Sequence, residues 1–334
     1  MERVFQKSKV TKNQFFKKHA SVLRVYAFLI VFILLVGCLD EDFLSVRNFQ
    51  NLLVTACAPM MIAFAQGTVM LTGGIDLSLG GVVAFTNVVC VTLMKPENSA
   101  GWVLAVLSAV LTGALCGAFN GLLITKGRLA PIIVTLASNW IFAGAALFVM
   151  PAAGGSVHAG FAKVLNSRLG GIPAALWIIL IALMLIRTIT NRTPFGKALR
   201  AIGGNEHSAF STGINVERTK LKAYLLSGVF ASVAGIFLAA QMYSGNPKLG
   251  ESYAMNAVTA VVLGGCSMSG AVGDMLGVTA GVFIVSIINN MLNLMGISSF
   301  YQYVVQGVIL IVALSISPVK NMLAELMPKK ETLQ

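Results

Sequence analysis

The sequence predicts an all-α polytopic membrane protein, and three observations support this fold class. Hydrophobic residues make up 57% of the 334 residues and charged residues 11%, whereas soluble chains carry about 25% charged residues. The apolar residues gather in long runs, and basic residues flank these runs. So few charges cannot cover a water-facing surface, which excludes soluble globular, disordered and disulfide-scaffold proteins.

Ten apolar runs are candidate membrane spans, because a helix needs about 20 apolar residues to cross the hydrocarbon core. They cover residues 22–38, 52–72, 79–94, 101–125, 131–150, 173–190, 223–243, 256–272, 275–295 and 301–317. The third and eighth runs are short and rich in glycine. A basic tail, residues 1–21, and a second tail, residues 318–334, flank this membrane domain of residues 22–317.

The first run also resembles a lipoprotein signal, since it follows a basic tail and ends at Cys38. The tail is long for a signal, and nine further runs follow. We therefore expect an uncleaved membrane anchor.

The distribution of lysine and arginine predicts the orientation. With the N-terminus in the cytoplasm and all ten runs spanning the membrane, 19 of the 24 basic residues fall on the cytoplasmic side. Cytoplasmic loops of membrane proteins carry such an excess. We therefore predict ten spans with both termini in the cytoplasm. The net charge of +12 is then explained without a nucleic-acid partner.

The cysteines and histidines do not form a metal-binding pattern. The five cysteines and three histidines are scattered, with no CxxC pair and no histidine near a cysteine. The sequence therefore predicts no metal site and no cofactor. It also lacks a GxxxxGK[ST] phosphate loop, so that any ATP hydrolysis has to come from another chain.

A first interrupted segment, TGGIDLSLGG at residues 72–81, lies between the second and third runs. Its glycines are expected to break the helix and let backbones approach closely. These glycines are Gly73, Gly74, Gly80 and Gly81. Asp76 and Ser78 can cap the third run by accepting its free N–H groups. Because an ionisable group at membrane depth costs about 2.5–3.5 kcal/mol, Asp76 can also line a transport pathway.

A second interrupted segment, VVLGGCSMSGAVGD at residues 261–274, also ends in an aspartate. The expected helix breaks are Gly264, Gly265 and Gly270. Interrupted segments in both halves are typical of transporters built from internal repeats. We therefore expect two weakly related halves with a pathway between them.

The longest cytoplasmic loop, residues 191–222, contains a helix-start pattern at residues 203–206. A short turn, Ser208–Thr212, follows and is closed by Gly213. Residues 198–202 are too few to form an element of the core. A solvated basic linker would not need a capped turn between glycines, so this loop is interpreted as a docking element for a cytoplasmic partner.

Four segments match the signature of one family. They are GGIDLSLGG at 73–81, FNGLLITKGRLAPIIVTL at 119–136, TPFGKALRAIGGNEHSAFSTGI at 193–214 and VVLGGCSMSG at 261–270. On these segments the chain resembles the permeases of bacterial ATP-binding cassette (ABC) importers, in the ribose, galactose and xylose branch. Cys266 stands where this family usually has threonine, and Ala271 where it usually has glycine, which leaves the particular sugar open.

The resemblance implies a permease subunit that moves a monosaccharide, a ribose-like pentose or a hexose, across the bacterial cytoplasmic membrane. It implies no active site of its own. Three kinds of partner follow: two ATP-binding domains, often fused in one chain, an extracytoplasmic sugar-binding protein, and a second permease copy or a paralogue. The segment that would dock into the ATPase contains Asn205, Glu206, Ala209 and Gly213.

Polar residues inside the predicted spans are candidates for the sugar pathway, because sugar hydroxyls need hydrogen-bonding partners. Besides Asp76 and Ser78 we select Gln66, Asn120, Asn139 and Asn290. For each of these the alternative role is an interhelical hydrogen bond, which contributes about 0.6 kcal/mol.

Two other classes of membrane protein share some of these features. An ion-coupled secondary transporter also uses broken helices, but it usually carries more ionisable residues in its spans than Asp76 and Asp274. An intramembrane aspartyl protease would need a Gly-x-Gly-Asp pattern, and this fails because residue 272 is valine. The ion-coupled transporter therefore remains the alternative to an ABC permease.

Overall fold

The computed structural model describes residues 22–94, 101–250 and 252–298, together with residues 301, 304–308, 311–312 and 315. The two predicted tails, residues 1–21 and 318–334, lie outside the described residues. Much of the tenth predicted span, residues 301–317, also lies outside them, and its described residues are helical.

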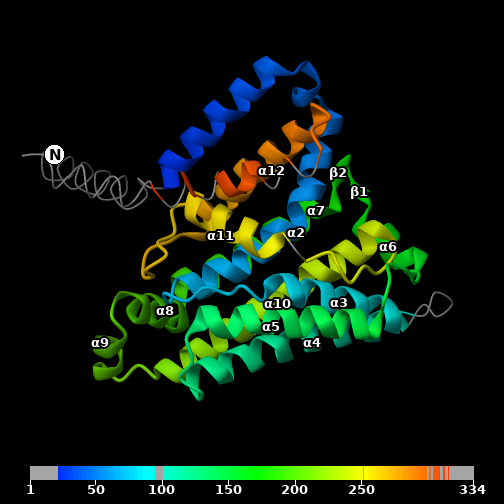
Figure 1. Cartoon of the computed structure of the whole chain (residues 1–334). Coiled ribbons are helices and arrows are strands. Elements are labelled where there is room, and N and C mark those ends of the chain that lie inside the picture. The colour runs from blue at the N-terminus through cyan, green and yellow to red at the C-terminus, as the bar shows by residue number, and fades with distance from the viewer. Residues whose placement is uncertain are drawn as a thin grey trace, which may run out of the picture.

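Long helices dominate the part of the chain that the structure describes (Figure 1). Seven of these helices are long and apolar enough to cross a membrane. They are Val22–Leu39, α2 (Val46–Met70), α4 (Gly101–Thr125), α5 (Pro131–Val149), α7 (Ala174–Arg192), α10 (Val216–Met242) and α12 (Met275–Leu294). Two shorter apolar helices are α3 (Leu79–Leu93) and α11 (Tyr253–Leu263). The all-α polytopic membrane fold is confirmed, whereas the number of ten spans stays a prediction.

The eighth predicted span, residues 256–272, is wrong in its second half. α11 ends at Leu263 because Gly265 adopts a left-handed conformation with φ +86°. Its 11 residues cover about 16 Å, roughly half of the hydrocarbon core. α11 is therefore a half-length helix, and a loop connects it to α12.

α2 and α10 form the centre of the bundle. In their most apolar windows 83% and 78% of the residues are buried, against 28% in α4 and α5 and 22% in α7. Phe64 of α2 packs edge-on against Phe230 of α10, with ring centroids 6.2 Å apart. α4 approaches α10 at Gly113 and Gly228, where a Cβ on either residue would collide with the backbone of the other.

The half-length helix α11 begins beside α3. A Cβ on Gly250, just before α11, would collide with the carbonyl group of Gly80 in the first turn of α3. Gly80 and Gly81 therefore do not break a helix as predicted, since both lie inside α3. They instead allow the backbone of α3 to lie directly against its neighbours.

The two ends of the bundle carry different short elements. One end carries α8 (Pro194–Gly204) and α9 (Glu206–Ser211). The opposite end carries η1 (Glu41–Leu44), α6 (Ala159–Leu165), β1 (Arg168–Leu169) and β2 (Ile172–Pro173). The strands β1 and β2 form an antiparallel pair.

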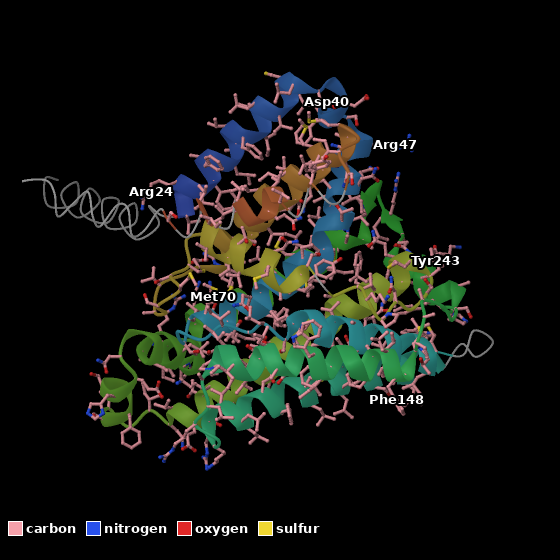
Figure 2. All side chains as sticks on the ribbon, viewed as in Figure 1. Arg24, Asp40, Arg47, Met70, Phe148 and Tyr243 are labelled. Carbon is pink, nitrogen blue, oxygen red and sulfur yellow. The ribbon has the colours of Figure 1, made fainter. Side chains whose placement is uncertain are left out.

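The side chains labelled in Figure 2 lie at one or the other of these two ends. Arg24 and Met70 lie towards the end that carries α8 and α9. Asp40, Arg47, Phe148 and Tyr243 lie towards the opposite end. The first helix and α2 therefore run in opposite directions, and α5 and α10 end at the same end of the bundle.

Candidate functional site

The first interrupted segment turns into the interior of the protein and buries Asp76, which is 2% exposed. One carboxylate oxygen, Oδ1, accepts hydrogen bonds from the amide and the hydroxyl of Ser78, at 3.0 and 2.6 Å. The other oxygen, Oδ2, accepts a hydrogen bond from the hydroxyl of Ser227 on α10, at 2.8 Å. Within the described residues no basic side chain forms an ion pair with Asp76.

Three more helices close around this carboxylate. Gln66 of α2 accepts a hydrogen bond from the Asp76 amide at 3.3 Å, and Asn120 of α4 donates one to the Ser78 hydroxyl at 2.7 Å. Thr135 of α5 donates a hydrogen bond to the Ile75 carbonyl at 3.3 Å. We call Gln66, Asp76, Ser78, Asn120 and Ser227 the Asp76 cluster. It joins four of the six residues predicted for the pathway.

Three buried polar atoms around this cluster have no hydrogen-bond partner in the described structure. They are Gln66 Nε2, Asn120 Oδ1 and Tyr224 Oη. Tyr224 Oη lies against the break, because a Cβ on Gly74 would stand 2.8 Å from it. An unpaired buried polar group costs about 1–3 kcal/mol. Such a set of free donors and acceptors suits a guest that carries hydroxyl groups.

Ser227 and Tyr224 were not predicted from the sequence. The only feature of the sequence that marks them is that each is a polar residue inside the apolar run of α10. Residues three apart on a helix share a face, and this face turns towards the first interrupted segment. The spacing alone could have suggested their proximity to each other but not to Asp76.

The predicted capping of α3 by Asp76 and Ser78 is wrong. Ser78 stands at the N-cap position, but its side chain accepts no hydrogen bond from the first turn of α3. Asn139 of α5 supplies a cap instead, since its Oδ1 accepts a hydrogen bond from the Gly81 amide at 2.8 Å. Asp76 does not cap α3 because both of its carboxylate oxygens already accept hydrogen bonds, from the hydroxyls of Ser78 and Ser227.

Asn290, the remaining pathway candidate, lies elsewhere. It exchanges two hydrogen bonds with Asn48 of α2, at 3.0 and 2.9 Å. This pair lies near the first turn of α2 and the last turns of α12. The six predicted pathway residues therefore occupy three separate places in the bundle.

The two interrupted segments meet at a point that we call the glycine junction. It consists of Gly73, Gly203 and Gly270 with the backbone of Leu71 and Ala271. The Ala271 amide donates a hydrogen bond to the Leu71 carbonyl at 3.1 Å, which joins the two segments directly. Gly203, in the last turn of α8, fills the space beside this bond, since its Cβ would collide with both backbones. Side chains larger than hydrogen are therefore excluded at Gly203.

Gly270 completes the junction from the other side. A Cβ on it would stand 2.7 Å from Gly203 Cα and 2.7 Å from the Gly73 amide nitrogen. Gly73 and Gly270 also adopt left-handed conformations, with φ +79° and φ +92°. Both are thus helix breaks, as predicted. Their contact with Gly203 could not be predicted from the sequence.

Arg200 of α8 fastens the second interrupted segment. Its guanidinium donates to the Gly273 carbonyl and to Asn191 Oδ1, both at 2.7 Å. Asn191 in turn donates to Asp274 Oδ2 at 3.3 Å. Asp274 Oδ1 caps α12 by accepting a hydrogen bond from the Leu276 amide at 2.9 Å. Asp274 is therefore a helix cap.

α8 was not expected as an element of the core, and this expectation is wrong. Its 11 residues form a helix that buries Leu199 and Ile202. Thr193 starts it by accepting a hydrogen bond from the Gly196 amide at 3.2 Å, and Pro194 occupies the first position. This start lies four residues before residue 198, so that α8 is long enough to pack against the bundle.

α9 agrees with the capped turn predicted in this loop. Asn205 Oδ1 accepts a hydrogen bond from the Ser208 amide at 2.8 Å. Glu206 begins the helix and forms an ion pair with Lys220 of α10 at 2.6 Å. Ala209 is buried, and Gly213 ends the turn with φ +85°.

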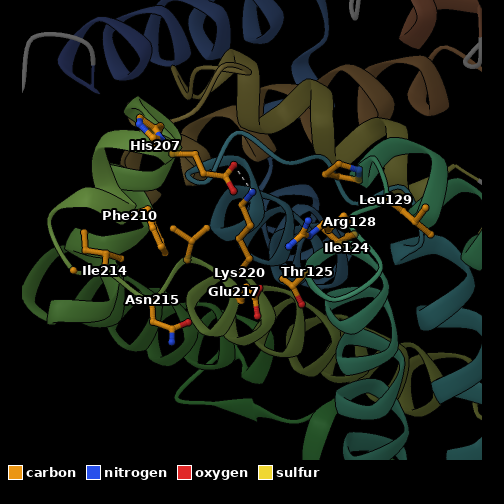
Figure 3. Close-up of a pocket in the computed structure, with 14 residues that line it drawn as sticks. Ile124, Thr125, Arg128, Leu129, His207, Phe210, Ile214, Asn215, Glu217 and Lys220 are labelled. Carbon is orange, nitrogen blue, oxygen red and sulfur yellow. Dashed lines mark hydrogen bonds and ion pairs between the residues drawn. The ribbon is translucent and has the colours of Figure 1, made fainter.

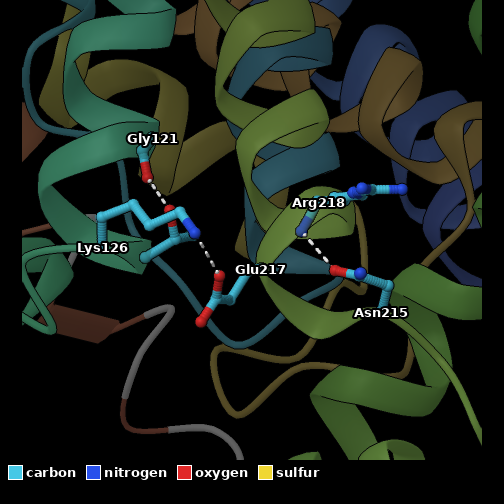
Figure 4. Close-up of polar contacts among 6 residues, drawn as sticks. Gly121, Lys126, Asn215, Glu217 and Arg218 are labelled. Atoms are coloured by element: carbon cyan, nitrogen blue, oxygen red, sulfur yellow. Dashed lines mark hydrogen bonds and ion pairs between the residues drawn. The ribbon is translucent and has the colours of Figure 1, made fainter.

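A groove of about 1030 Å³ separates α9 from the α4–α5 connection (Figure 3). Arg128 and Leu129 line one side of this groove, and Phe210 lines the other. Phe210 is 68% exposed. Lys126 and Glu217 form an ion pair at 3.1 Å beside it (Figure 4).

Known proteins identify the kind of membrane protein. The family described as branched-chain amino acid transport system, permease component, matches residues 48–314. The chain belongs to this permease family. The permease is accordingly a transport component rather than an enzyme, and a multi-pass protein of the inner membrane.

Individual relatives are similar over most of the permease. The ribose import permease protein RbsC of Bacillus subtilis is 38% identical over 296 residues, which cover 88% of this chain and 91% of the relative. The galactose/methyl galactoside import permease protein MglC of Escherichia coli is 32% identical, with 89% and 94% covered. The L-arabinose ABC transporter permease protein AraH of Azospirillum brasilense is 33% identical, with 86% and 85% covered. No solved structure matches the permease.

Proposed function

We propose that this permease is the translocation subunit of an ATP-driven importer and that its cargo is a monosaccharide, with ribose as the first candidate. The similarity to ribose, galactose and arabinose permeases over most of each chain carries this proposal. ATP hydrolysis is assigned to a separate ATPase subunit, because the permease sequence has no phosphate loop. An extracytoplasmic binding protein delivers the sugar, and a second permease copy or a paralogue completes the pathway.

The orientation that we propose places α8 and α9 in the cytoplasm and the β1–β2 ribbon outside. The predicted excess of basic residues on the cytoplasmic side supports it. Cysteine at exposed Gly170, between β1 and β2, should react with an impermeant thiol reagent added to intact cells. Cysteine at exposed Ser211 of α9 should react only after the cells are opened, and its labelling in intact cells would reverse the orientation.

The ATPase docks, in this proposal, on α9 through Asn205, Glu206, Ala209 and Gly213. An isolated helix of six residues is marginal in water, so α9 needs support from its neighbours and from a partner. Asn205 caps it, Ala209 anchors it, and Glu206 and exposed Phe210 are available for contact. The groove beside α9 offers the space for a protruding element of the partner.

Motion of α9 reaches the membrane through α8 and the glycine junction. The single contact that supports this step is Gly203, which leaves no space between α8 and the backbones of Leu71 and Ala271. A tightly packed contact transmits displacement because it cannot be compressed. A shift of α8 therefore moves both interrupted segments together.

The Asp76 cluster is the proposed place where these movements meet the sugar. Gln66, Asp76, Ser78 and Asn120 are buried in the present conformation, and the unpaired atoms Gln66 Nε2, Asn120 Oδ1 and Tyr224 Oη can bond a hydroxylated guest once the break opens. Asn139 and Asn290 already have partners in Gly81 and Asn48. Their hydrogen bonds account for their polarity, so we assign them to helix packing.

Reconstitution tests the proposed function. The permease and the ATP-binding subunit that co-purifies with it are placed in liposomes, and radiolabelled ribose, galactose and arabinose are offered with the binding protein outside. We expect uptake that requires ATP inside. Uptake driven by a proton or sodium gradient without the ATPase would replace this proposal by the ion-coupled alternative.

A further inference from the structure

A second pocket, of about 290 Å³, lies at the inner end of α7 and shares no residue with the groove beside α9. It is lined by Leu183, Met184, Arg187, Thr188, Asn191, Arg192 and Leu276. Six of these residues belong to α7, and Leu276 belongs to the first turn of α12. We call it the α7 pocket.

The lining of the α7 pocket changes from apolar to basic along the helix. Leu183 and Arg192 are separated by about 14 Å along the axis, at 1.5 Å per residue. Met184 is 71% exposed, as a side chain in contact with lipid tails would be, whereas Arg192 ends the helix at the end of the bundle that the proposed orientation places in the cytoplasm. The pocket therefore crosses the boundary between hydrocarbon and head groups.

The basic part of the pocket has no matching acidic partner. Among the described residues neither Arg187 nor Arg192 forms an ion pair. Asp274 borders the pocket, but one of its oxygens accepts from Asn191 and the other caps α12 at Leu276. Tyr26 of the first helix lies within electrostatic range of Arg187 and Asp274. The pocket therefore contains two arginines, and the one carboxylate that borders it is already hydrogen-bonded.

We infer that the α7 pocket binds an anionic phospholipid of the inner leaflet. The phosphate lies between Arg187 and Arg192, where guanidinium groups can form bidentate bonds with phosphate oxygens. Thr188 and Asn191 offer neutral hydrogen bonds to the head group. One acyl chain lies along Leu183, Met184 and Leu276. Basic pockets between membrane helices on the cytoplasmic side bind anionic head groups in this way.

The apolar half of the pocket distinguishes a lipid from a free phosphate ion. A soluble anion would use the arginines alone and would leave Leu183 and Met184 without a role. The pocket also touches Asn191, which holds Arg200 of α8. A lipid in this pocket therefore lies one hydrogen bond away from the element that carries the glycine junction.

Lipid binding is measured on the full-length permease, purified in detergent and titrated by native mass spectrometry. The probes are dioleoyl phosphatidylglycerol, dioleoyl phosphatidylcholine and inorganic phosphate. We expect phosphatidylglycerol to bind in preference to phosphatidylcholine, and the double variant Arg187→Gln/Arg192→Gln to weaken it by about tenfold, as expected for loss of charge-assisted bonds. The control Arg47→Gln/Arg168→Gln removes the same charge at the opposite end and should bind as the wild type does.

A second measurement does not depend on the folding of a variant. Wild-type permease is irradiated with phosphatidylglycerol that carries a photoreactive group in its acyl chain, and cross-linked peptides are sequenced. Cross-links within residues 183–192 or at the start of α12 support the inference. Cross-links elsewhere, equal binding of the two lipids, unchanged binding by the double variant, or displacement of the lipid by phosphate alone would overturn it. None of these results bears on the cargo of the permease.

Discussion

The two interrupted segments both combine glycines with an aspartate but hold their aspartates in different surroundings. In the first segment Asp76 is buried, and its carboxylate accepts hydrogen bonds from Ser78 and Ser227. In the second segment Asp274 is half-buried and caps α12 at the Leu276 amide. Glycines and an aspartate therefore take part in a polar cluster among four helices in the first segment and in a helix cap in the second.

What the two segments share is their backbone contact. The Leu71 carbonyl and the Ala271 amide join them, and Gly203 of α8 packs against both. Substitutions at this shared contact should disturb both halves, whereas substitutions at either aspartate should disturb only one. Variants at the shared contact and at each aspartate test this distinction.

Gly203→Ala should have the largest effect on transport, because it disturbs both segments at once: the new Cβ meets backbone atoms of Leu71 and Ala271 that cannot rotate away. We expect overpacking to lower the stability of the permease by about 1–3 kcal/mol. ATP-driven sugar uptake should fall with it. Thermal unfolding in detergent and uptake in liposomes measure the two effects.

Gly204→Ala is the matched control, since its Cβ would meet only the Ala271 side chain at an ordinary 3.8 Å. It should unfold and transport as the wild type does. If the two alanine variants behave alike, the junction is looser than the structure describes.

Asp76→Ala and Asp274→Ala should separate the two aspartates. Loss of the Asp76 carboxylate leaves the buried hydroxyls of Ser78 and Ser227 without their acceptor, at about 1–3 kcal/mol for each unpaired group. Loss of the Asp274 cap costs about 1 kcal/mol. Unfolding of the two variants side by side should rank them in this order, and the reverse order would contradict the comparison.

Substitution of each aspartate by asparagine removes the negative charge but keeps the size of the side chain. Asp274→Asn should transport as the wild type does, because asparagine is as good an N-cap as aspartate. Asp76→Asn should insert normally but transport more slowly, because it removes the charge that we place at the pathway. Transport at the wild-type rate by Asp76→Asn would leave Asp76 with a packing role alone.

Gly213→Val and Glu206→Lys address the docking element without touching either segment. Valine at φ +85° is strained by about 1–2 kcal/mol, and lysine at residue 206 replaces the ion pair with Lys220 by a repulsion. We expect normal membrane insertion but weaker co-purification of the ATPase and less hydrolysis stimulated by the binding protein. Gly213→Asn, which tolerates the left-handed conformation, is the control and should retain coupling.

Ala271→Gly should have the smallest effect, with the opposite sign. Ala271 adopts φ +63° at the glycine junction, a conformation that costs an L-residue about 1–2 kcal/mol. Glycine relieves this strain but loses about 0.5–1 kcal/mol of chain entropy, so a small gain in thermal stability is expected. Ala198→Gly, inside α8, should lower stability instead, and equal losses in both variants would show that Ala271 is unstrained.

The long helices, the glycine breaks at Gly73, Gly265 and Gly270, and the capped turn of α9 could be predicted because each depends on its own stretch of sequence. Apolar run length, left-handed glycines and an asparagine cap are local signals. Gln66, Asp76 and Asn120 could be selected because each is a polar residue in or beside an apolar run. Their proximity to one another could not be predicted.

The remaining features depend on contacts between distant parts of the chain. Asn139 of α5 caps α3 because the packing of the two helices brings it to the Gly81 amide. Gly203 must be glycine because two other segments reach it. Ser227 joins the Asp76 cluster from a distance of 151 residues along the chain. At each of these positions the sequence shows a polar or small residue but not the distant residue that it contacts.

The reciprocal pair of Asn48 and Asn290 has a consequence for how the chain is made. The two asparagines are 242 residues apart, which corresponds to roughly 12–48 s of synthesis at about 5–20 residues per second. During this interval the side chain of Asn48 is without its later partner, but it can already donate to the nearby Phe43 carbonyl, at 3.0 Å in the finished structure. α2 can therefore enter the membrane early with the side-chain amide of Asn48 hydrogen-bonded. α12 packs against it later, when Asn290 has been synthesised.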